Sequence, residues 1–169
     1  AIYHGHNGLI NILFEIIGLD YRQTWLIEKN NSIIAIAFTH GWQYMGYHMI
    51  ILYAAIKAIP DQYFDAAKID GAKPLVLFWK VTRPLLSEAY KICLIFSITG
   101  GLKAFGNILV MTGGGPGTMS YTLSIYMYKT AFTEFEYGAG TAIAFILVLQ
   151  CILVYILINR FVSRERVRY

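Results

Sequence analysis

The amino-acid sequence predicts an all-α membrane protein, a bundle of helices with three spans visible in the chain. Its composition is the first observation: 57% of the 169 residues are hydrophobic and only 14% are charged. Soluble domains carry about 25% charged residues, because their surfaces face water. The second observation is that the few charges are grouped, which leaves long windows without any Asp, Glu, Lys or Arg.

Three apolar windows are the predicted spans, since a bilayer core requires about 20 consecutive apolar residues. Residues 30–56 and 137–159 contain no Asp, Glu, Lys or Arg. Residues 88–110 are mostly apolar, although Lys91 and Lys103 interrupt them. A lysine can reach the interface along its aliphatic stem, so this window is also expected to span.

The distribution of positive charge predicts the orientation. Residues 57–91 carry six of the 14 Lys and Arg residues, and residues 160–169 carry four. Positive residues gather on the cytoplasmic side of membrane proteins, so the segment at 57–87 and the basic tail at 160–169 are expected to be cytoplasmic. Residues 1–29 and 111–136 would then lie outside. The net charge of +4 is accordingly a signal of topology and not of nucleic-acid binding.

The outer segment 1–29 contains one short apolar stretch, residues 9–19. It is too short to cross a bilayer. Asn11, Glu15 and Gly18 recur there at helical spacing and form one polar strip. The pattern predicts a helix that lies at the outer membrane interface or packs on spans that this chain does not contain.

Residues 57–87 combine charge with turn-forming residues between two predicted spans. Pro60 suits the first turn of a helix, Gly71 suits a helix end, and Pro74 can begin a second helix. Pro84 would then bend the chain before the next span. The pattern predicts a helix–turn–helix beneath the membrane, whose small and charged residues suit docking into a cleft of another protein. An ordinary solvated loop is the alternative on these residues alone.

The same segment resembles the EAA motif of ABC importer permeases, the inner-membrane components of binding-protein-dependent sugar importers. That motif has E-A-A, three residues, a glycine, and I-x-L-P further on. The resemblance implies a site that couples the chain to an ATPase, formed by Asp65, Ala66, Ala67, Asp70, Gly71, Ala72 and Pro84. The sequence departs from the motif at three positions: Asp65 replaces Glu, Val81 replaces Ile, and Arg83 replaces Leu.

A second resemblance lies in the glycine loop, residues 110–123, with the sequence VMTGGGPGTMSYTL. It is similar to the Gly-Gly-Pro loop of the carbohydrate-importing branch of this superfamily. Consecutive glycines allow backbone angles that other residues resist, so the loop is expected to fold back and present its backbone to a partner or to the entrance. The residues concerned are Gly113, Gly114, Gly115 and Pro116. A flexible connector is the alternative.

The two resemblances imply the C-terminal part of a permease subunit in a bacterial-type cell membrane. Such a subunit would form the translocation path for a carbohydrate that an extracytoplasmic binding protein delivers, and it would pair with a second, different permease subunit. ATP would be hydrolysed by separate ATPase subunits. The chain is expected not to be an enzyme, and it contains no G-x-x-x-x-G-K-[ST] phosphate-binding motif.

Two other functions stay open at this point. The same architecture could import another small solute, such as a polyamine or a polyol phosphate. A channel or passive membrane scaffold is a different class, in which residues 65–86 are only a loop. Dependence on an ATPase distinguishes a permease from a channel.

Polar residues inside the predicted spans suggest where a substrate could pass. His40, Tyr44 and His48 recur at every fourth position, which places them on one face of a helix. Polar groups in a membrane tend to face the bundle interior or a watery path. The hypothesis is that the path is lined by Tyr44, His48, Asn107 and Gln150. Hydrogen bonding between helices is the alternative.

No cofactor and no metal site is predicted. His4 and His6 form an H-x-H pair without a third ligand nearby in the sequence. Cys93 and Cys151 lie in apolar windows, where the role of a small buried side chain is expected.

Overall fold

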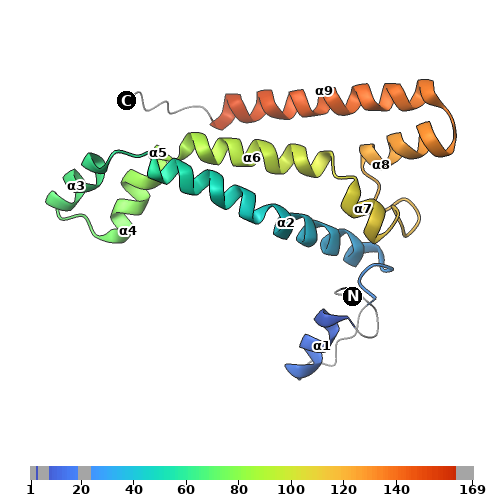
Figure 1. Ribbon diagram of the computed structural model, residues 1–169, viewed down its shortest axis with the longest axis horizontal. Coiled ribbons are helices and arrows are strands. Elements are labelled where there is room, and N and C mark those ends of the chain that lie inside the picture. Colours follow the sequence, from blue (N-terminus) through green and yellow to red (C-terminus); the bar gives the residue numbers. More distant parts are fainter. Residues whose placement is uncertain (1–2, 4–7, 19–23, 163–169) are drawn as a thin grey trace. The chain divides into compact units, whose positions relative to one another are not determined.

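The computed structural model describes Tyr3, residues 8–18 and residues 24–162. Within these ranges the chain is helical and contains no strand (Figure 1), which confirms the all-α prediction there. The elements in chain order are α1 Leu9–Ile16, α2 Lys29–Lys57, α3 Asp61–Ile69, α4 Pro74–Leu77, the π-helical turn η1 Phe78–Thr82, α5 Arg83–Leu85, α6 Ser87–Leu102, α7 Gly106–Met111, α8 Leu123–Tyr128, the π-helical turn η2 Lys129–Thr133 and α9 Tyr137–Val162. His4, His6 and most of the basic tail lie outside the described residues.

The helix bounds follow the charge-free windows closely in two places, since α2 contains window 30–56 and α9 contains window 137–159. The window at 88–110 is divided between two helices. α6 ends at Leu102 and α7 begins at Gly106. The Thr122 hydroxyl donates to the carbonyl oxygen of Ala104 at 2.7 Å, and this bond holds the non-helical residues between them.

One of the described helices, α9, is both long and apolar enough to cross a membrane by itself. The mean hydropathy of its most apolar stretch, within Tyr137–Phe161, is 2.8, and no residue of that stretch is buried. A second candidate is the pair Pro74–Leu85 and Ser87–Leu102, which is bent by 67°. α2 has sufficient length, but polar residues such as Gln43 and His48 lower its hydropathy. The arrangement of three spans therefore remains a prediction.

The chain divides into two compact units, which are described separately. Unit 1 comprises Ala1–Gln43 and Gly100–Leu149, and unit 2 comprises Tyr44–Thr99 and Gln150–Tyr169. The boundaries fall within α2, α6 and α9, so each of these helices contributes residues to both units.

Unit 1 has a small apolar core between three helices. Ile36 of α2, Ile108 of α7 and Ile125 of α8 are buried together. Thr122 precedes α8, and its side-chain oxygen accepts a hydrogen bond from the Ile125 N–H and so caps the helix. Four partly buried residues surround this core: Ala104, Phe105, Met111 and Tyr121.

The first helix of unit 1, α1, buries one residue of its polar strip. Asn11 is only 2% exposed. Its side-chain oxygen accepts a hydrogen bond from the Trp25 indole at 2.8 Å, and Phe14 stacks on Trp25 with ring centroids 6.2 Å apart. The polar residue is therefore used to attach α1 to the segment that precedes α2.

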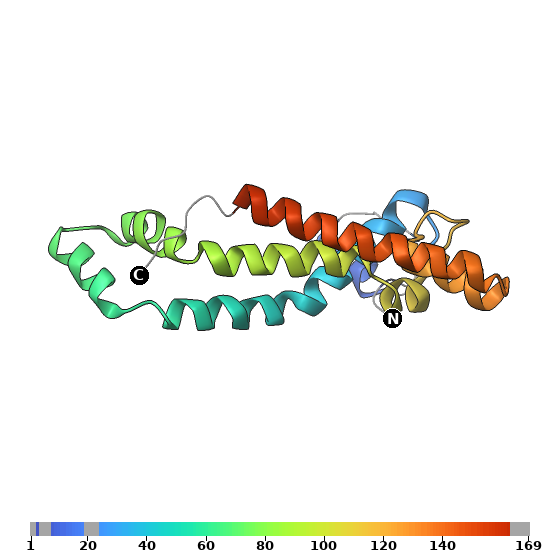
Figure 2. The ribbon, with the colours of Figure 1, turned by 90° about the horizontal axis from the view of Figure 1, so that it is seen from above.

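Unit 2 is built around the bend between α5 and α6. The second part of α2 runs beside α6 in both ribbon views (Figures 1 and 2). His48 and Ser97 join these two helices through a hydrogen bond of 3.0 Å between the ring Nε2 and the hydroxyl oxygen. α3 and α4 lie beyond the bend and present most of their surface to the surroundings.

Candidate functional site

The EAA-like segment, residues 57–87, contains an exposed helix–turn–helix. α3 follows Pro60, whose backbone is extended (φ −61°, ψ 137°). Beyond the last turn of α3 lies a left-handed Gly71 (φ 72°). The Gly71 N–H donates to the Lys68 carbonyl at 2.9 Å, and the Ala72 N–H donates to the Ala67 carbonyl at 3.0 Å. This is the left-handed helix end that glycine favours, and it directs the chain into α4 as predicted.

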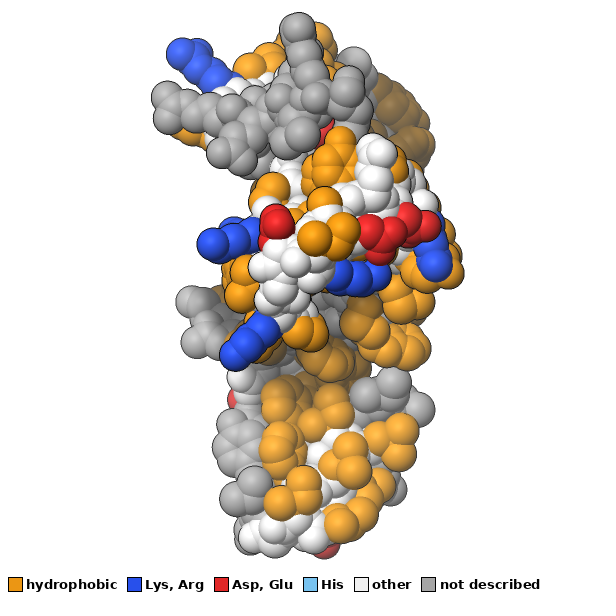
Figure 3. Space-filling view, turned by 90° about the vertical axis from the view of Figure 1, so that its left-hand side faces the viewer, with side chains coloured by type: hydrophobic (Ala, Val, Ile, Leu, Met, Phe, Trp, Pro, Cys, Tyr) orange, Lys and Arg blue, Asp and Glu red, His pale blue; other side chains and the backbone are white. Residues whose placement is uncertain are grey.

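The surface of this segment combines apolar and charged side chains. No residue of α3 or α4 is buried. Ile69 and Leu75, on either side of the turn, are 86% and 74% exposed. Acidic, basic and hydrophobic side chains gather on this end of unit 2 (Figure 3). Exposed apolar side chains flanked by charge are typical of a contact surface for another protein.

The predicted coupling residues are accessible. Asp65 and Lys68 form an ion pair within α3, with Oδ1 and Nζ 3.0 Å apart, and both side chains are largely exposed. Exposed pairs contribute at most about 1 kcal/mol, so the Asp65 carboxylate can exchange Lys68 for a partner at little cost. Asp65, Ala66, Asp70 and Gly71 are exposed, while Ala67 and Ala72 are half-buried.

The remaining coupling residue, Pro84, lies at the other end of the segment. It occupies the first turn of α5, directly before the 67° bend that leads into α6. Its neighbour Arg83, the cation at an apolar position of the motif, places its guanidinium carbon 4.9 Å from the centre of the Trp79 ring. The aromatic face thus replaces the apolar contact that a leucine would make.

The glycine loop is folded back and closed by two hydroxyl side chains. Thr112 and Ser120 lie with their oxygens 2.9 Å apart. The Ser120 hydroxyl donates to the Gly115 carbonyl at 2.7 Å, and the Gly114 N–H donates to the Thr112 oxygen at 3.2 Å. The loop therefore has the predicted reversal of direction, and these side chains oppose the alternative of a flexible connector.

The internal bonds of the loop also limit what it can offer. The Gly114 N–H and the Gly115 carbonyl were expected to be available to a partner, but both are bonded within the loop. Sequence reasoning missed Thr112 and Ser120, because hydroxyl residues are frequent in turns and their spacing of eight carries no recognised signal.

In unit 2, His48 is held between α2 and α6. Its Nδ1 lies 2.8 Å from the Tyr44 carbonyl oxygen. Its Nε2 lies 3.0 Å from the Ser97 hydroxyl and 3.2 Å from the Cys93 carbonyl oxygen. Both ring nitrogens thus face carbonyl oxygens, which only accept, whereas the Ser97 hydroxyl can donate to or accept from Nε2. These contacts attach the His48 ring to α6.

In unit 1, Asn107 meets the polar face of α2. Its side-chain amide donates to the Gln43 side-chain oxygen at 2.8 Å and lies 3.4 Å from Nδ1 of His40. Two amides and an imidazole thus come together from α7 and α2. Sequence reasoning placed Asn107 with Tyr44 and His48, but its contacts in unit 1 are with the preceding turn of α2.

Gln150, the last predicted path residue, belongs to unit 2. Its side-chain oxygen is buried and has no hydrogen-bond partner within the part of the chain that is described. A buried amide oxygen without a partner is costly, so this group is suited to accept a bond from another molecule or chain. The four path residues therefore divide between the units, with Tyr44, His48 and Gln150 in unit 2 and Asn107 in unit 1.

The polar residues provide hydrogen-bonding chemistry. Amides, imidazoles and hydroxyls can both donate and accept, which suits a ligand rich in hydroxyl groups. Among the described residues, no three His, Cys, Asp or Glu side chains are grouped so that they could hold a metal ion.

The helical arrangement places the chain in a structural class. It matches a chain of the crystal structure of a bacterial alginate ABC transporter, in complex with an alginate pentasaccharide-bound periplasmic protein, with a TM-score of 0.82. The match covers 96% of this chain and 56% of that chain at 21% sequence identity. The chain thus has the fold of the membrane subunits of ABC importers.

The sequence assigns the family within that class. Residues 9–167 match the family described as binding-protein-dependent transport system inner membrane component, and the chain belongs to this family. It is 34% identical over 149 residues to the probable ABC transporter permease protein YurN of Bacillus subtilis, covering 88% of this chain and 51% of that protein.

The name of a second relative includes a sugar. The chain is 32% identical over 163 residues to the trehalose/maltose transport system permease protein MalF of Thermococcus litoralis, covering 95% of this chain and 55% of that protein. The chain thus spans about half the length of these two relatives. The resemblance found in the EAA-like segment and the glycine loop is confirmed at the level of the family.

Proposed function

We propose that the chain is part of the permease subunit of an ATP-driven ABC importer and contributes to the translocation path for a carbohydrate. Membership of the family of inner-membrane transport components supports the class. The sugar in the name of one relative and the alginate transporter of similar fold support the substrate class. A permease of this kind is not an enzyme, because ATP is hydrolysed in separate subunits.

The proposed topology has three spans at 30–56, 88–110 and 137–159. The hydropathy of α9 and the exposed apolar side chains along it support membrane insertion. The bias of Lys and Arg toward residues 57–91 and 160–169 supports a cytoplasmic EAA-like segment and C-terminus. The glycine loop then lies outside, where a binding protein delivers the substrate.

The exposed helix–turn–helix of α3 and α4 is the observation that carries the proposal. Its accessible acidic and small residues, beside the exposed Ile69 and Leu75, suit docking into a cleft of an ATPase. α4, η1 and α5 follow one another without a loop and lead into α6 through the bend at Leu86. Movement of the ATPase would therefore be transmitted through the helical stretch α4–α5 and the bend at Leu86 to α6.

The other partners follow from the same architecture. A second permease subunit, expected to be a different chain, would complete the path, and an extracytoplasmic binding protein would dock at the outer side. Tyr44, His48, Asn107 and Gln150 are proposed to line the path. Their hydrogen-bonding groups support this role, since a carbohydrate needs both donors and acceptors.

An affinity pull-down of the full-length permease with its ATPase tests the proposal. Asp65→Lys reverses the accessible carboxylate, and Gly71→Trp places a bulky residue at a left-handed position (φ 72°). Both variants are expected to lose the ATPase while the permease remains folded. Glu134→Lys is the matched control, because it reverses an exposed carboxylate on the side proposed to be outside.

Two kinds of outcome would contradict parts of the proposal. Unchanged ATPase association in both variants would show that the EAA-like segment is not the docking site, and absence of ATPase association in the wild type would favour a channel or passive scaffold. The second kind of outcome concerns ATP-dependent uptake by vesicles that contain the complete transporter. If they take up a polyamine or a polyol phosphate and no carbohydrate, the substrate class is reassigned and the architecture still holds.

A further inference from the structure

A pocket of about 650 Å³ lies in unit 2, at the bend between the helical stretch Pro74–Leu85 and α6. The two stretches meet at 67°, and residues from both sides of the bend line the pocket. Most of the lining is apolar. The lining residues are Trp79, Arg83, Pro84, Ser87, Tyr90, Cys93, Leu94 and Ser97.

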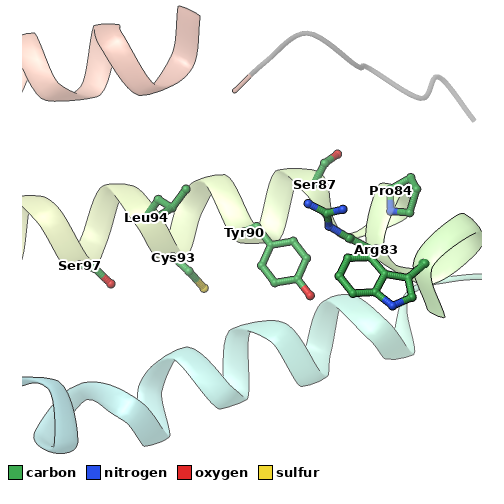
Figure 4. A pocket seen from close by; sticks show the side chains of 8 residues that line it. Arg83, Pro84, Ser87, Tyr90, Cys93, Leu94 and Ser97 are labelled. Atoms are coloured by element: carbon green, nitrogen blue, oxygen red, sulfur yellow. The ribbon is translucent and has the colours of Figure 1, made fainter. Parts of the chain in front are cut away.

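The chemistry of the lining changes along the pocket. Arg83, Trp79 and Tyr90 lie near the bend, and Cys93 and Ser97 follow one and two turns further along α6. Tyr90, Cys93 and Ser97 point from α6 toward α2, whereas the Arg83 guanidinium lies near Ser87 (Figure 4). The polar end is formed by an arginine and two aromatic residues of the kind that concentrate at membrane–water interfaces.

The Arg83 guanidinium is available to an anion. It lies over the Trp79 ring at 4.9 Å and forms no ion pair with any described residue. Stacking uses the face of the guanidinium and leaves its N–H donors at the edge free, in a geometry that matches a phosphate. Lys68 and Lys91 are paired with Asp65 and Glu88, and Arg83 is the cation among the residues that line the pocket.

The pocket lining contains no carboxylate to repel an anion. The Tyr90 side chain also lines the pocket, and its hydroxyl can donate a second hydrogen bond. Further along α6 the lining is apolar at Cys93 and Leu94, with one hydroxyl at Ser97. An anionic head attached to a hydrocarbon chain satisfies both ends, whereas a free anion would leave the apolar end empty.

We propose that this pocket binds one anionic phospholipid of the cytoplasmic leaflet. The phosphate lies on Arg83 and Tyr90, and the first part of an acyl chain lies along α6 toward Leu94. Basic pockets beside membrane helices on the cytoplasmic side commonly hold anionic head groups. The inference rests on the orientation proposed above, in which the bend lies at the cytoplasmic surface. The bound lipid would stabilise the bend through which α4–α5 leads into α6.

The test measures lipid retained by the full-length permease, purified with its partner subunits in mild detergent and analysed by native mass spectrometry. The protein is incubated with phosphatidylglycerol or, separately, with phosphatidylcholine. The wild type is expected to retain one phosphatidylglycerol in preference to phosphatidylcholine. Arg83→Gln is expected to reduce this retention roughly tenfold, the usual effect of removing a charged hydrogen-bonding group. Arg83→Lys should retain an intermediate amount.

Lys73→Gln is the matched control, because Lys73 is an exposed cation of the same segment that does not line the pocket. It should retain phosphatidylglycerol as the wild type does. The assignment would be overturned if Arg83→Gln retained as much phosphatidylglycerol as the wild type. It would also be overturned if Arg83→Gln and Lys73→Gln reduced the retention to the same extent. Absence of a bound lipid in the wild type would show that another part of the transporter covers the pocket, and would also overturn it.

This result is distinguishable from failure of the proposed function. The Arg83→Gln transporter is expected to retain its ATPase, because Arg83 lines the pocket and stacks on Trp79 and does not belong to α3. Loss of lipid with the ATPase still bound supports the lipid site alone. Loss of the ATPase in Asp65→Lys, with lipid retained, tests the coupling segment alone.

Discussion

Replacing Gly114 by alanine tests the structure of the glycine loop at its most constrained point. Gly114 has φ 96°, a conformation that costs an L residue about 1–2 kcal/mol. A Cβ at this position would lie 2.4 Å from Cε1 and 2.8 Å from Cδ1 of the Tyr121 ring, and 3.4 Å from Cγ2 of Ile125. Ile125 is fully buried, so it leaves little room for the ring to move.

The expected loss of stability combines the two effects. Overpacking of a well-filled site costs about 1–3 kcal/mol, which added to the backbone strain gives about 2–5 kcal/mol. Gly113→Ala is the matched control, because Gly113 is also left-handed (φ 62°) but a Cβ there meets nothing within 4 Å. Only the strain of about 1–2 kcal/mol applies to it.

The assay is reversible unfolding of the full-length permease in mixed detergent micelles, followed by circular dichroism. Gly114→Ala is expected to be less stable than Gly113→Ala by the overpacking contribution. Equal stability of the two variants would refute the close approach of Tyr121. Wild-type stability in both would refute the left-handed conformation of the loop.

Three further predictions concern the other sites. Gly71→Ala places a Cβ at φ 72° and should cost about 1–2 kcal/mol while weakening ATPase association in a titration. Unchanged association would show that the turn is not part of the docking surface. Ser97→Ala removes the hydroxyl that is hydrogen-bonded to His48 Nε2 and should lower stability by about 0.5–1.5 kcal/mol. No loss would mean that this bond contributes nothing. Asn107→Leu removes the hydrogen bond from the Asn107 amide to Gln43 and should reduce ATP-dependent carbohydrate uptake about tenfold if Asn107 lines the path. Uptake at the wild-type rate would show that Asn107 does not line the path.

Local sequence chemistry was sufficient to predict the helices and turns whose formation depends on neighbouring residues. Length and absence of charge located α2 and α9, because both signals lie within one continuous window. Gly71 and Pro74 marked the turn between α3 and α4, because a left-handed helix end and a helix start have residue preferences of their own. Pro84 likewise marked the bend, although the angle could not be predicted.

Long-range contacts account for what the sequence did not reveal. The break between α6 and α7 is fixed at Ala104 by the hydroxyl of Thr122, a residue 18 positions away. Ser97 was not predicted as the partner of His48, because no local pattern shows which face of α6 meets α2. The sequence shows that Asn107 is a polar residue in an apolar window. Its hydrogen-bond partner Gln43 is known only from the folded chain.

Photo-crosslinking from Ile69 tests the central claim, that α3 and α4 dock on an ATPase, most directly. Ile69 is 86% exposed beside the turn, so Ile69→Cys, in a full-length permease lacking Cys93 and Cys151, can carry a benzophenone. Tyr137→Cys is the control, since Tyr137 is 60% exposed on the proposed outer side. In membranes containing the complete transporter, an adduct with the ATPase from position 69 and none from position 137 is predicted. No adduct from position 69, or an equal adduct from both positions, would contradict the account.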